Sequence, residues 1–214
     1  MDVVVAGGHG QVAMRLHPLL RERGDVVRAI IRNPDHADDV KAAGAEPVML
    51  DLEGDEDAAA AVGSADAVVF AAGAGSGSGT KRKRTMDLGG AVKLIEAAKE
   101  NGISRYVMVS SMGAGEPPPD GTGDVFGEYL RAKAEADRAL ADSGLAYTIV
   151  RPGRLSDDPG TGRVRLGPSV ERGAIPRADV AAVLAEVLHT DSTVGKTFEV
   201  VSGDAEIAEA LGQL

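Results

Sequence analysis

The sequence predicts an α/β fold in which helices cover both faces of a parallel sheet. Short apolar runs rich in Val, Ile and Ala alternate with longer segments rich in Ala, Leu and Glu. The apolar runs are mostly continuous, which is typical of strands that are buried on both faces. Strand–helix alternation requires crossover connections, which keep the strands parallel. Glycine also follows several predicted helices, where it favours helix termination: Gly24, Gly44, Gly63, Gly102 and Gly144.

The alternation gives six strands and five helices before residue 151. The expected strands are Asp2–Ala6, Val26–Ile31, Glu46–Leu50, Ala67–Ala71, Arg105–Ser110 and Ala146–Val150. The expected helices are Gln11–Arg23, Asp35–Ala43, Glu56–Val62, Thr85–Asn101 and Asp124–Ser143. Two segments between them, Gly73–Arg84 and Gly113–Gly123, are expected to be long loops, which often carry function.

The pattern loosens after Val150 into a small C-terminal extension. A short strand is expected near Arg163–Leu166, a helix from Pro176 to about His189, a strand at Thr197–Val201 and a short helix at Ala205–Leu211. We expect one domain over residues 1–214, in which residues 151–196 contribute most of the substrate side.

Composition excludes several classes of protein. Hydrophobic residues make up 43% of the 214 residues, no apolar run is long enough to span a membrane, and there is no cysteine. A net charge of −10 and an aromatic content of 3% argue against a nucleic-acid partner. We therefore expect a cytoplasmic monomer or homodimer that binds a small molecule and has no membrane partner. The four histidines lack metal-ligand spacing, so no metal is expected.

The strongest local signal is the glycine-rich turn VVVAGGHGQVA after the first strand. Gly7 or Gly8 permits a tight turn, Gly10 lets the backbone approach a pyrophosphate, and Ala13 keeps the following helix close to the strand. The helix N-terminus would then offer free N–H groups to the phosphates. A glycine-rich turn without a ligand is the alternative. The position on the first strand favours a Rossmann-type doubly wound sheet with these cofactor contacts: Gly7, Gly8, His9, Gly10, Gln11 and Val12.

The second and third strands bear on the choice of cofactor. NAD-binding proteins carry an acidic residue at the end of the second strand, whereas this strand is followed by Arg32 and Asn33. A guanidinium suits a 2′-phosphate, so we expect NADP in preference to NAD. Asp51 and Leu52 follow the third strand, where an adenine ring would lie. Arg32 could equally be a solvated arginine, and Asp51 a helix cap or a turn residue.

These residues resemble the short-chain dehydrogenase/reductase superfamily, and specifically its atypical, NmrA-like, epimerase-like members. The resemblance rests on AGGHGQVA, IRNP, LDL, FAAGAG, YVMVSS, YLRAK, YTIVRPG and IPRADVA, which span nearly the whole chain. It implies cofactor contacts from Ala71, Ala72 and Gly73 on the adenosine side, and from Ser110, Pro152 and Gly153 beside the nicotinamide. It further implies that Ser111 orients the substrate, that Tyr129 and Lys133 form the Y-x-x-x-K pair, and that Asp87 replaces a catalytic asparagine of many relatives.

The chemistry of this set is proton transfer beside a nicotinamide. Tyr129 and Lys133 are four residues apart and share one face of a helix. A phenol ordinarily has a pKa near 10, and a nearby ammonium stabilises the phenolate. Tyr129 could then act as general acid or base, while Lys133 also holds the nicotinamide ribose and Ser111 holds the substrate oxygen. Alternatively, Tyr129 simply packs and Lys133 pairs with Asp137; a pairing with Asp87 would alter the proton relay.

Three functions remain open. The first is an NADP-dependent oxidoreductase or epimerase that acts on a small carbonyl or hydroxyl compound. The second is a sensor that binds NADP(H) without chemistry, and the third is a reductase of flavin-like or tetrapyrrole-like substrates, such as biliverdin. Only about sixty residues follow Val150, which argues against a nucleotide-sugar domain. The basic run Lys81–Arg84 is expected to be a solvated loop, with a phosphate clamp or an anionic-substrate contact as the alternatives.

Overall fold

The computed structural model describes residues 1–75, 77–117 and 123–214. Its strands are β1 (Asp2–Ala6), β2 (Val26–Ile31), β3 (Glu46–Met49), β4 (Ala67–Phe70), β5 (Arg105–Val109), β6 (Ala146–Pro152), β7 (Arg154–Ser156), β8 (Arg163–Gly167), β9 (Ala174–Pro176), β10 (Lys196–Ser202) and β11 (Ala205–Glu206). Its α-helices are α1 (Ala13–Glu22), α2 (Ala37–Ala42), α3 (Ala58–Val62), α4 (Thr80–Arg82), α5 (Ala91–Glu100), α6 (Asp124–Ala141), α7 (Arg177–Leu188) and α8 (Ile207–Gly212). Two 3₁₀ turns, η1 (Pro34–His36) and η3 (Asp191–Thr193), and a π-helix, η2 (Lys83–Gly90), complete the set.

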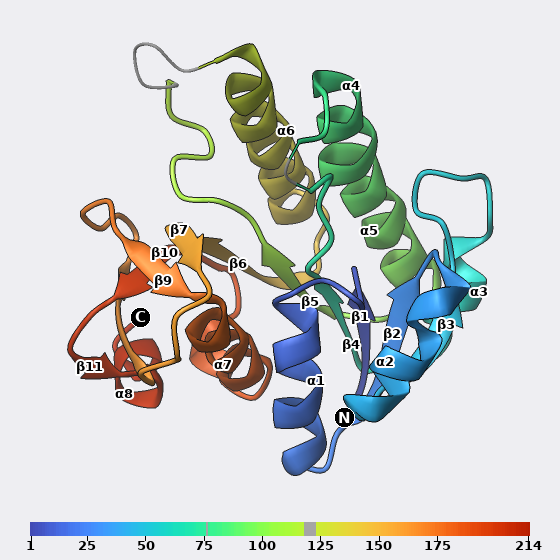
Figure 1. Cartoon of the computed structure of the whole chain (residues 1–214), viewed down its shortest axis with the longest axis horizontal. Helices are drawn as coiled ribbons and strands as arrows, with labels where there is room; N and C mark the ends of the chain where they lie inside the picture. Colours follow the sequence, from blue (N-terminus) through green and yellow to red (C-terminus); the bar gives the residue numbers. More distant parts are fainter. Residues whose placement is uncertain (76, 118–122) are drawn as a thin grey trace.

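The main sheet has the order β11-β8-β10-β6-β5-β4-β1-β2-β3 in the part of the chain that the structure describes (Figure 1). From β3 to β10 along this order all neighbouring strands are parallel, and β8 joins antiparallel to β10. The chain fills the sheet outward in opposite directions from β1 and β4. The connections that leave β1 and β4 therefore lie on opposite faces of the sheet, and a crevice forms between the carboxyl ends of these two strands. Doubly wound sheets bind ligands at such a point. The predicted Rossmann-type fold is therefore confirmed.

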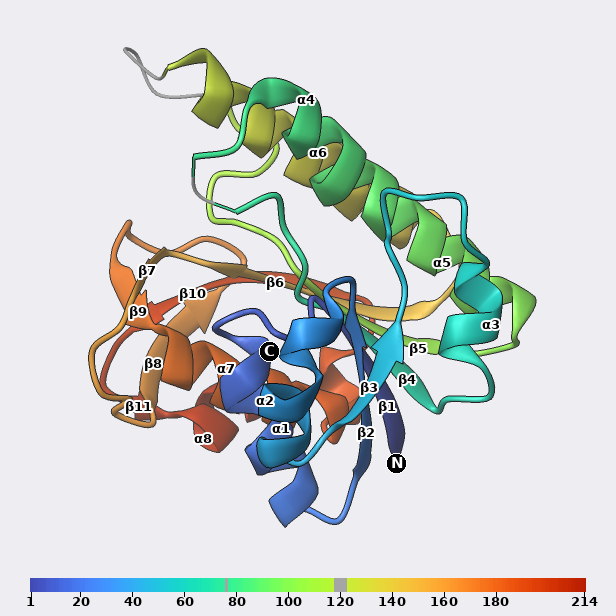
Figure 2. The same cartoon turned by 45° about the vertical axis from the view of Figure 1, so that its right-hand side comes forward.

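Helices pack on both faces of the sheet and enclose two apolar cores (Figure 2). On one face α1 and α7 lie side by side and bury Leu16 and Leu184. On the other face α3, α5 and α6 bury Leu94 and Leu140. The continuous apolar strands seen in the sequence are explained by this double coverage, because both faces of each central strand contact a core. Within the described ranges, no helix combines the length and the apolar character needed to cross a membrane.

Most element boundaries follow the sequence pattern. β1 and β2 have the expected limits, and the remaining central strands differ by one or two residues. The predicted glycines after α1 and α6, Gly24 and Gly144, have φ angles of 85° and 83°, so each ends its helix in the left-handed conformation. The C-terminal extension differs more: β7 and β9 pair in a small second sheet, and β11 precedes α8.

The prediction of a loop over Gly73–Arg84 is wrong from Thr80 onward. The chain becomes helical at Thr80 and continues through α4, η2 and α5 without a break. Contacts with distant segments stabilise this early start, since Arg84 forms ion pairs with Glu128 and Glu135 of α6 at 2.8 and 3.1 Å. Of the other expected loop, Gly113–Gly123, residues 118–122 lie outside the described residues.

The turn after β1 packs closely against the neighbouring strand. The Gly8 amide donates to the carbonyl of Ile30 at 2.9 Å. A Cβ atom on Gly8 would lie 2.6 Å from Cβ of Ala29 and 3.1 Å from its Cα, far inside van der Waals contact. Glycine is thus required at this position by the close approach of the turn to β2.

Replacing Gly8 with alanine should therefore destabilise the fold by about 1–3 kcal/mol, because β2 must move to accept the new methyl group. The matched control is Gly79→Ala, since a Cβ atom there meets nothing within 4 Å. The control should change the free energy of unfolding by less than about 0.5 kcal/mol. Urea denaturation of both variants measures the difference, and equal stabilities would show that the turn has room for a side chain.

Candidate functional site

A cavity of about 310 Å³ lies at the carboxyl ends of β1, β2 and β4. Its floor is the glycine-rich turn and its outer wall is the segment after β2. Most of the residues that the sequence predicts for the adenosine side of a cofactor line it: Gly7, Gly8, His9, Gly10, Arg32, Asp51, Leu52, Ala71, Ala72 and Gly73. Two of the predicted cofactor residues, Gln11 and Asn33, line neither this cavity nor the larger one beside it. Further lining that the sequence did not indicate comes from His36 and Gly75, and Arg82 of the basic run also lines this cavity.

The glycine-rich turn presents unoccupied backbone donors. Among the described residues, the amides of Gln11 and Val12 have no hydrogen-bond acceptor, as expected just before a helix. A Cβ atom on Gly10 would come within 2.9 Å of the Gly7 carbonyl, so only glycine leaves the turn open. Together with the positive end of α1, these amides fit a diphosphate.

A buried histidine supports the same turn. His17 on α1 is fully buried, and its Nε2 donates to the Gly8 carbonyl at 2.7 Å. Burial lowers the pKa of His17, so the ring stays neutral and Nε2 carries the proton. The turn is consequently held from below by a side chain that the sequence reading did not assign to the site.

Two arginines meet over one carboxylate at the outer end of this cavity. Arg32 Nη1 and Arg82 Nε lie 3.5 and 3.0 Å from Oε2 of Glu53. Although burial opposes ionisation of Glu53, hydrogen bonds from Thr85 and Arg82 prevail and lower its pKa, so it is a carboxylate at neutral pH. Arg32 after β2 is therefore joined by Arg82 of α4 and by the carboxylate of Glu53 after β3, where the end of the second strand had indicated a single arginine.

The neighbouring predicted residues have structural partners of their own. Asn33 Oδ1 accepts from the amide of Asp35 and caps η1, and Asp51 Oδ1 accepts from the amide of Glu53. The His9 ring stacks on that of His36 with a centroid distance of 3.7 Å. Asn33 thus acts as a helix cap here, whereas Asp51 keeps a place in the cavity wall.

A second and larger cavity, of about 920 Å³, shares the segment Ala71–Gly75 with the first. It lies between the carboxyl ends of β4, β5 and β6 and the first turns of α6. The predicted residues that line it are Val12, Ala71, Ala72, Gly73, Asp87, Ser110, Ser111, Tyr129, Lys133, Pro152 and Gly153. From the expected substrate-side segment 151–196, only Pro152, Gly153 and Leu155 reach this wall. The π-helix η2 and the beginning of α6 supply more of it.

Lys133 and Asp87 form a buried ion pair in this cavity. The Lys133 Nζ atom lies 3.3 Å from Asp87 Oδ1 and donates to the Val109 carbonyl at 3.1 Å. Asp87 Oδ2 accepts from the amide of Ala74 at 3.2 Å, which fixes the segment after β4. Both side chains are at most 4% exposed, so the lysine charge is compensated within the protein. The sequence offered both Asp87 and Asp137 as ion-pair partners of Lys133, and in the structure the partner is Asp87.

Tyr129 lies beside this pair and faces the cavity. Its ring centroid is 6.0 Å from Lys133 Nζ and 5.9 Å from the ring centroid of Phe126. Ser111 lines the same cavity from the end of β5, and its hydroxyl donates to the Met112 carbonyl at 3.3 Å. The structure therefore brings Ser111, Tyr129, Lys133 and Asp87 to one cavity.

Ser110 is engaged on the other side of its strand end. Its hydroxyl donates to Asp137 Oδ2 at 2.8 Å, and the same oxygen lies 2.9 Å from Arg151 Nε. Burial raises the pKa of Asp137. Because its hydroxyl is bonded to Asp137, Ser110 offers the cavity little beyond its backbone.

The basic run Lys81–Arg84 is not a solvated loop. Arg82 contacts Glu53, Arg84 contacts two glutamates of α6, and Lys83 is buried with its ammonium 5.2 Å from the ring centroid of Tyr129. Lys81 and Arg84 are exposed as expected, but Arg84 is held by its ion pairs to α6. The distant carboxylates that fix the run belong to other segments, so their pairing could not be inferred from local sequence.

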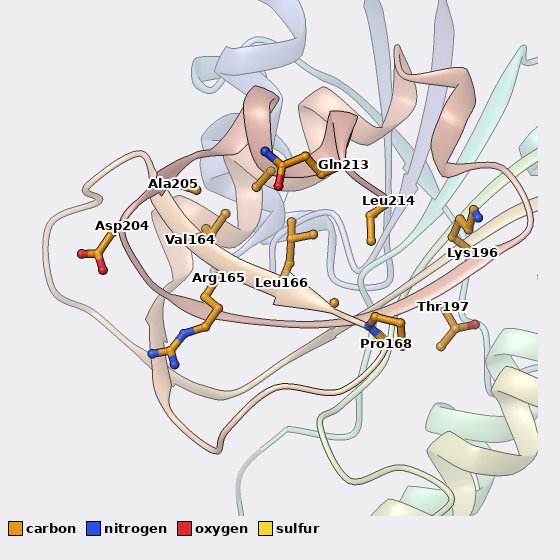
Figure 3. A pocket seen from close by; sticks show the side chains of 12 residues that line it. Val164, Arg165, Leu166, Pro168, Lys196, Thr197, Asp204, Ala205, Gln213 and Leu214 are labelled. Atoms are coloured by element: carbon orange, nitrogen blue, oxygen red, sulfur yellow. The ribbon is translucent and has the colours of Figure 1, made fainter.

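A further cavity of about 570 Å³ lies at the opposite end of the sheet, between β8 and the C-terminal residues (Figure 3). Leu166 and Leu214 contribute apolar side chains to it, and Arg165 and Asp204 lie toward its outer end. None of the predicted cofactor or catalytic residues lines this cavity. The chemistry of the molecule is accordingly assigned to the two connected cavities at the glycine-rich end.

Comparison with known proteins places this geometry in a family. A family model described as NAD(P)H-binding matches residues 7–191. A Bacillus subtilis (strain 168) protein named uncharacterized sugar epimerase YhfK is 41% identical over 216 residues, and the match covers 100% of both chains. The 3-diazoavenalumate denitrifying reductase of a Streptomyces species is 31% identical over 228 residues, covering 96% of this chain and 73% of the relative.

A solved structure from Bacillus halodurans, under the provisional name NAD-dependent epimerase/dehydratase, superposes with a TM-score of 0.93 at 43% identity and covers 100% of both chains. The family model includes the glycine-rich turn, both connected cavities and α7. An NAD(P)H-binding assignment agrees with the free amides of that turn and with the resemblance expected from the sequence. This chain belongs to the NAD(P)H-binding family, which is consistent with the expected resemblance to atypical short-chain dehydrogenases/reductases.

Proposed function

We propose that this protein is an NADP-dependent reductase of a small carbonyl compound. One observation carries the proposal: Tyr129, Ser111 and the Lys133–Asp87 pair line a single cavity that adjoins the glycine-rich cofactor cavity. A phenol, a hydroxyl and a charged pair in this arrangement suit proton transfer to a carbonyl oxygen. A relative named 3-diazoavenalumate denitrifying reductase supports a reduction, although its name specifies a diazo group and not a carbonyl.

Each polar residue of the larger cavity has a separate role in the proposed reduction. When bound, a reduced nicotinamide supplies the hydride that adds to the carbonyl carbon. Tyr129 donates its hydroxyl proton to the carbonyl oxygen as the C–H bond forms, and Ser111 holds that oxygen by a hydrogen bond. Lys133 stabilises the phenolate that remains until solvent returns a proton to Tyr129. Asp87 keeps Lys133 in place and anchors the segment after β4 through the amide of Ala74.

NADP is favoured over NAD by the charges at the end of β2. Arg32 and Arg82 both line the adenosine-side cavity and both reach Glu53. A 2′-phosphate at this point would accept charge-assisted hydrogen bonds from two guanidinium groups. Glu53 would hold the arginines in position before the phosphate arrives.

Reduction is favoured over sugar epimerisation by the walls of the larger cavity. Val12, Phe126 and Leu155 give this cavity apolar surfaces. A nucleotide sugar carries many hydroxyl groups, and each would need a polar partner on burial. An apolar carbonyl compound fits these apolar walls better than a nucleotide sugar does, although the Bacillus subtilis relative is named a sugar epimerase.

Tyr129→Phe tests the chemistry. The variant should lose NADPH oxidation against a panel of small carbonyls and quinones by a factor of about 10²–10⁴, because the proton donor is removed. Its NADP affinity should change less than about twofold. Tyr147→Phe is the matched control, since Tyr147 lies on β6 and lines neither connected cavity. If no carbonyl is reduced, or if Tyr129→Phe is as active as the parent, the protein is better described as an NADP(H) sensor.

Arg32→Ala and Arg82→Ala test the cofactor. Each variant should weaken NADP binding about tenfold, because each removes one charge-assisted hydrogen bond to the 2′-phosphate. Binding of NAD should change less than about twofold. Lys81→Ala removes an exposed cation of the same run and serves as the control. Isothermal titration calorimetry gives both affinities, and equal losses for NADP and NAD would refute the 2′-phosphate assignment.

A further inference from the structure

Lys83 is a buried cation in the wall of the larger cavity. It begins the π-helix η2, is 9% exposed, and places its Nζ atom 5.2 Å from the ring centroid of Tyr129. π-Helical turns are rare and occur frequently at functional sites. Lys83 therefore lies next to the residue that acts as proton donor in the proposed reaction.

Lys83 differs from the neighbouring Lys133 in the group that its ammonium contacts. Lys133 is paired with Asp87, whereas Lys83 Nζ donates to the neutral carbonyl of Gly75 at 2.9 Å. Within the described ranges, no carboxylate lies within 4.0 Å of Lys83. The other carboxylate in the cavity wall, that of Asp124, is exposed to solvent at the start of α6. A buried ammonium without a counter-ion is costly, and an anionic ligand would remove that cost.

The surface around Lys83 is apolar and partly aromatic. Phe126 and Val125 are 48% and 44% exposed, and both line this cavity. Phe126 stacks on Tyr129 with an interplanar angle of 28°. Such a surface accepts a flat ring by stacking. The cavity thus combines an apolar platform for a ring with a cation that has no counter-ion among the described residues.

We propose that Lys83 binds a carboxylate on an aromatic carbonyl substrate, with the aromatic ring packed against Phe126. The proposal rests on the reductase function proposed above and specifies its substrate class. The carboxylate supplies the counter-ion that the described residues do not provide for Lys83, while the carbonyl group reaches Tyr129 and Ser111. A cofactor phosphate is the competing occupant of Lys83, and the experiment below separates the two.

The test is binding of a matched pair of probes to the NADP-saturated protein. 2-Naphthoate and 2-naphthamide have the same ring and differ in the charge of one group. Calorimetry should show that the parent protein binds naphthoate about tenfold more tightly than naphthamide, as a charge-assisted hydrogen bond implies. Lys83→Met should abolish this preference, and Lys83→Arg should retain part of it. Lys81→Met, which removes an exposed cation two residues away, should leave the preference unchanged.

Several outcomes would overturn the proposal: equal binding of the two probes, no binding of either at millimolar concentration, or a preference for naphthoate that survives Lys83→Met. An NADP affinity that falls in Lys83→Met as much as the naphthoate affinity would assign Lys83 to a cofactor phosphate. Because the probes are not turned over, this result is independent of the carbonyl panel. A failure of the reductase function and a failure of the carboxylate site can therefore be told apart.

Discussion

The close approach of the turn after β1 to its neighbouring strands governs the arrangement of the site. Gly7 and Gly8 have no Cβ atom, and this lets the turn lie against Ala72 of the segment after β4 and Ala29 of β2. The donors before α1 then point into the crevice between the two halves of the sheet. His17 locks the same turn from the side of the core. If the strands were further apart, neither the phosphate contacts nor the segment Ala71–Gly75 shared by both cavities would form.

The buried pair of Lys133 and Asp87 transmits this arrangement to the second cavity. Lys133 joins α6 to the end of β5, and Asp87 joins η2 to the segment after β4. One ion pair thus connects the elements that carry the proposed proton donor and the cofactor. A buried pair contributes little net stability, because desolvation offsets the attraction. Its main effect here is to fix the relative positions of four elements, and removal of either partner would leave an uncompensated charge.

The sequence predicts those parts of the fold that depend on local pattern. β1 and β2 have the expected limits because continuous apolar runs end at a polar or glycine residue. The sequence also predicts that the proposed catalytic residues meet in one place, because Ser111 follows β5 while Asp87, Tyr129 and Lys133 lie on the helical segments that follow β4 and β5. The prediction fails over Gly73–Arg84, where the helix begins earlier than its apolar pattern. There the decisive contacts are with Glu53 after β3 and with α6, more than twenty residues away in the chain, and such pairing has no local signature.

The side chains of the basic run Lys81–Arg84 extend to different parts of the molecule. Arg84 holds η2 against α6, Arg82 points to the adenosine side, and Lys83 points to the larger cavity. The chain carries a net charge of −10, so its long-range field repels anions. That field is screened beyond roughly 8–10 Å at physiological salt, whereas a cation in a weakly polar cavity wall acts strongly at contact distance. In the proposed function, binding of anionic groups by this acidic protein therefore depends on a few cations in the cavity walls. Arg82 lies where the proposed phosphate would arrive, and Lys83 lies where the proposed substrate carboxylate would arrive.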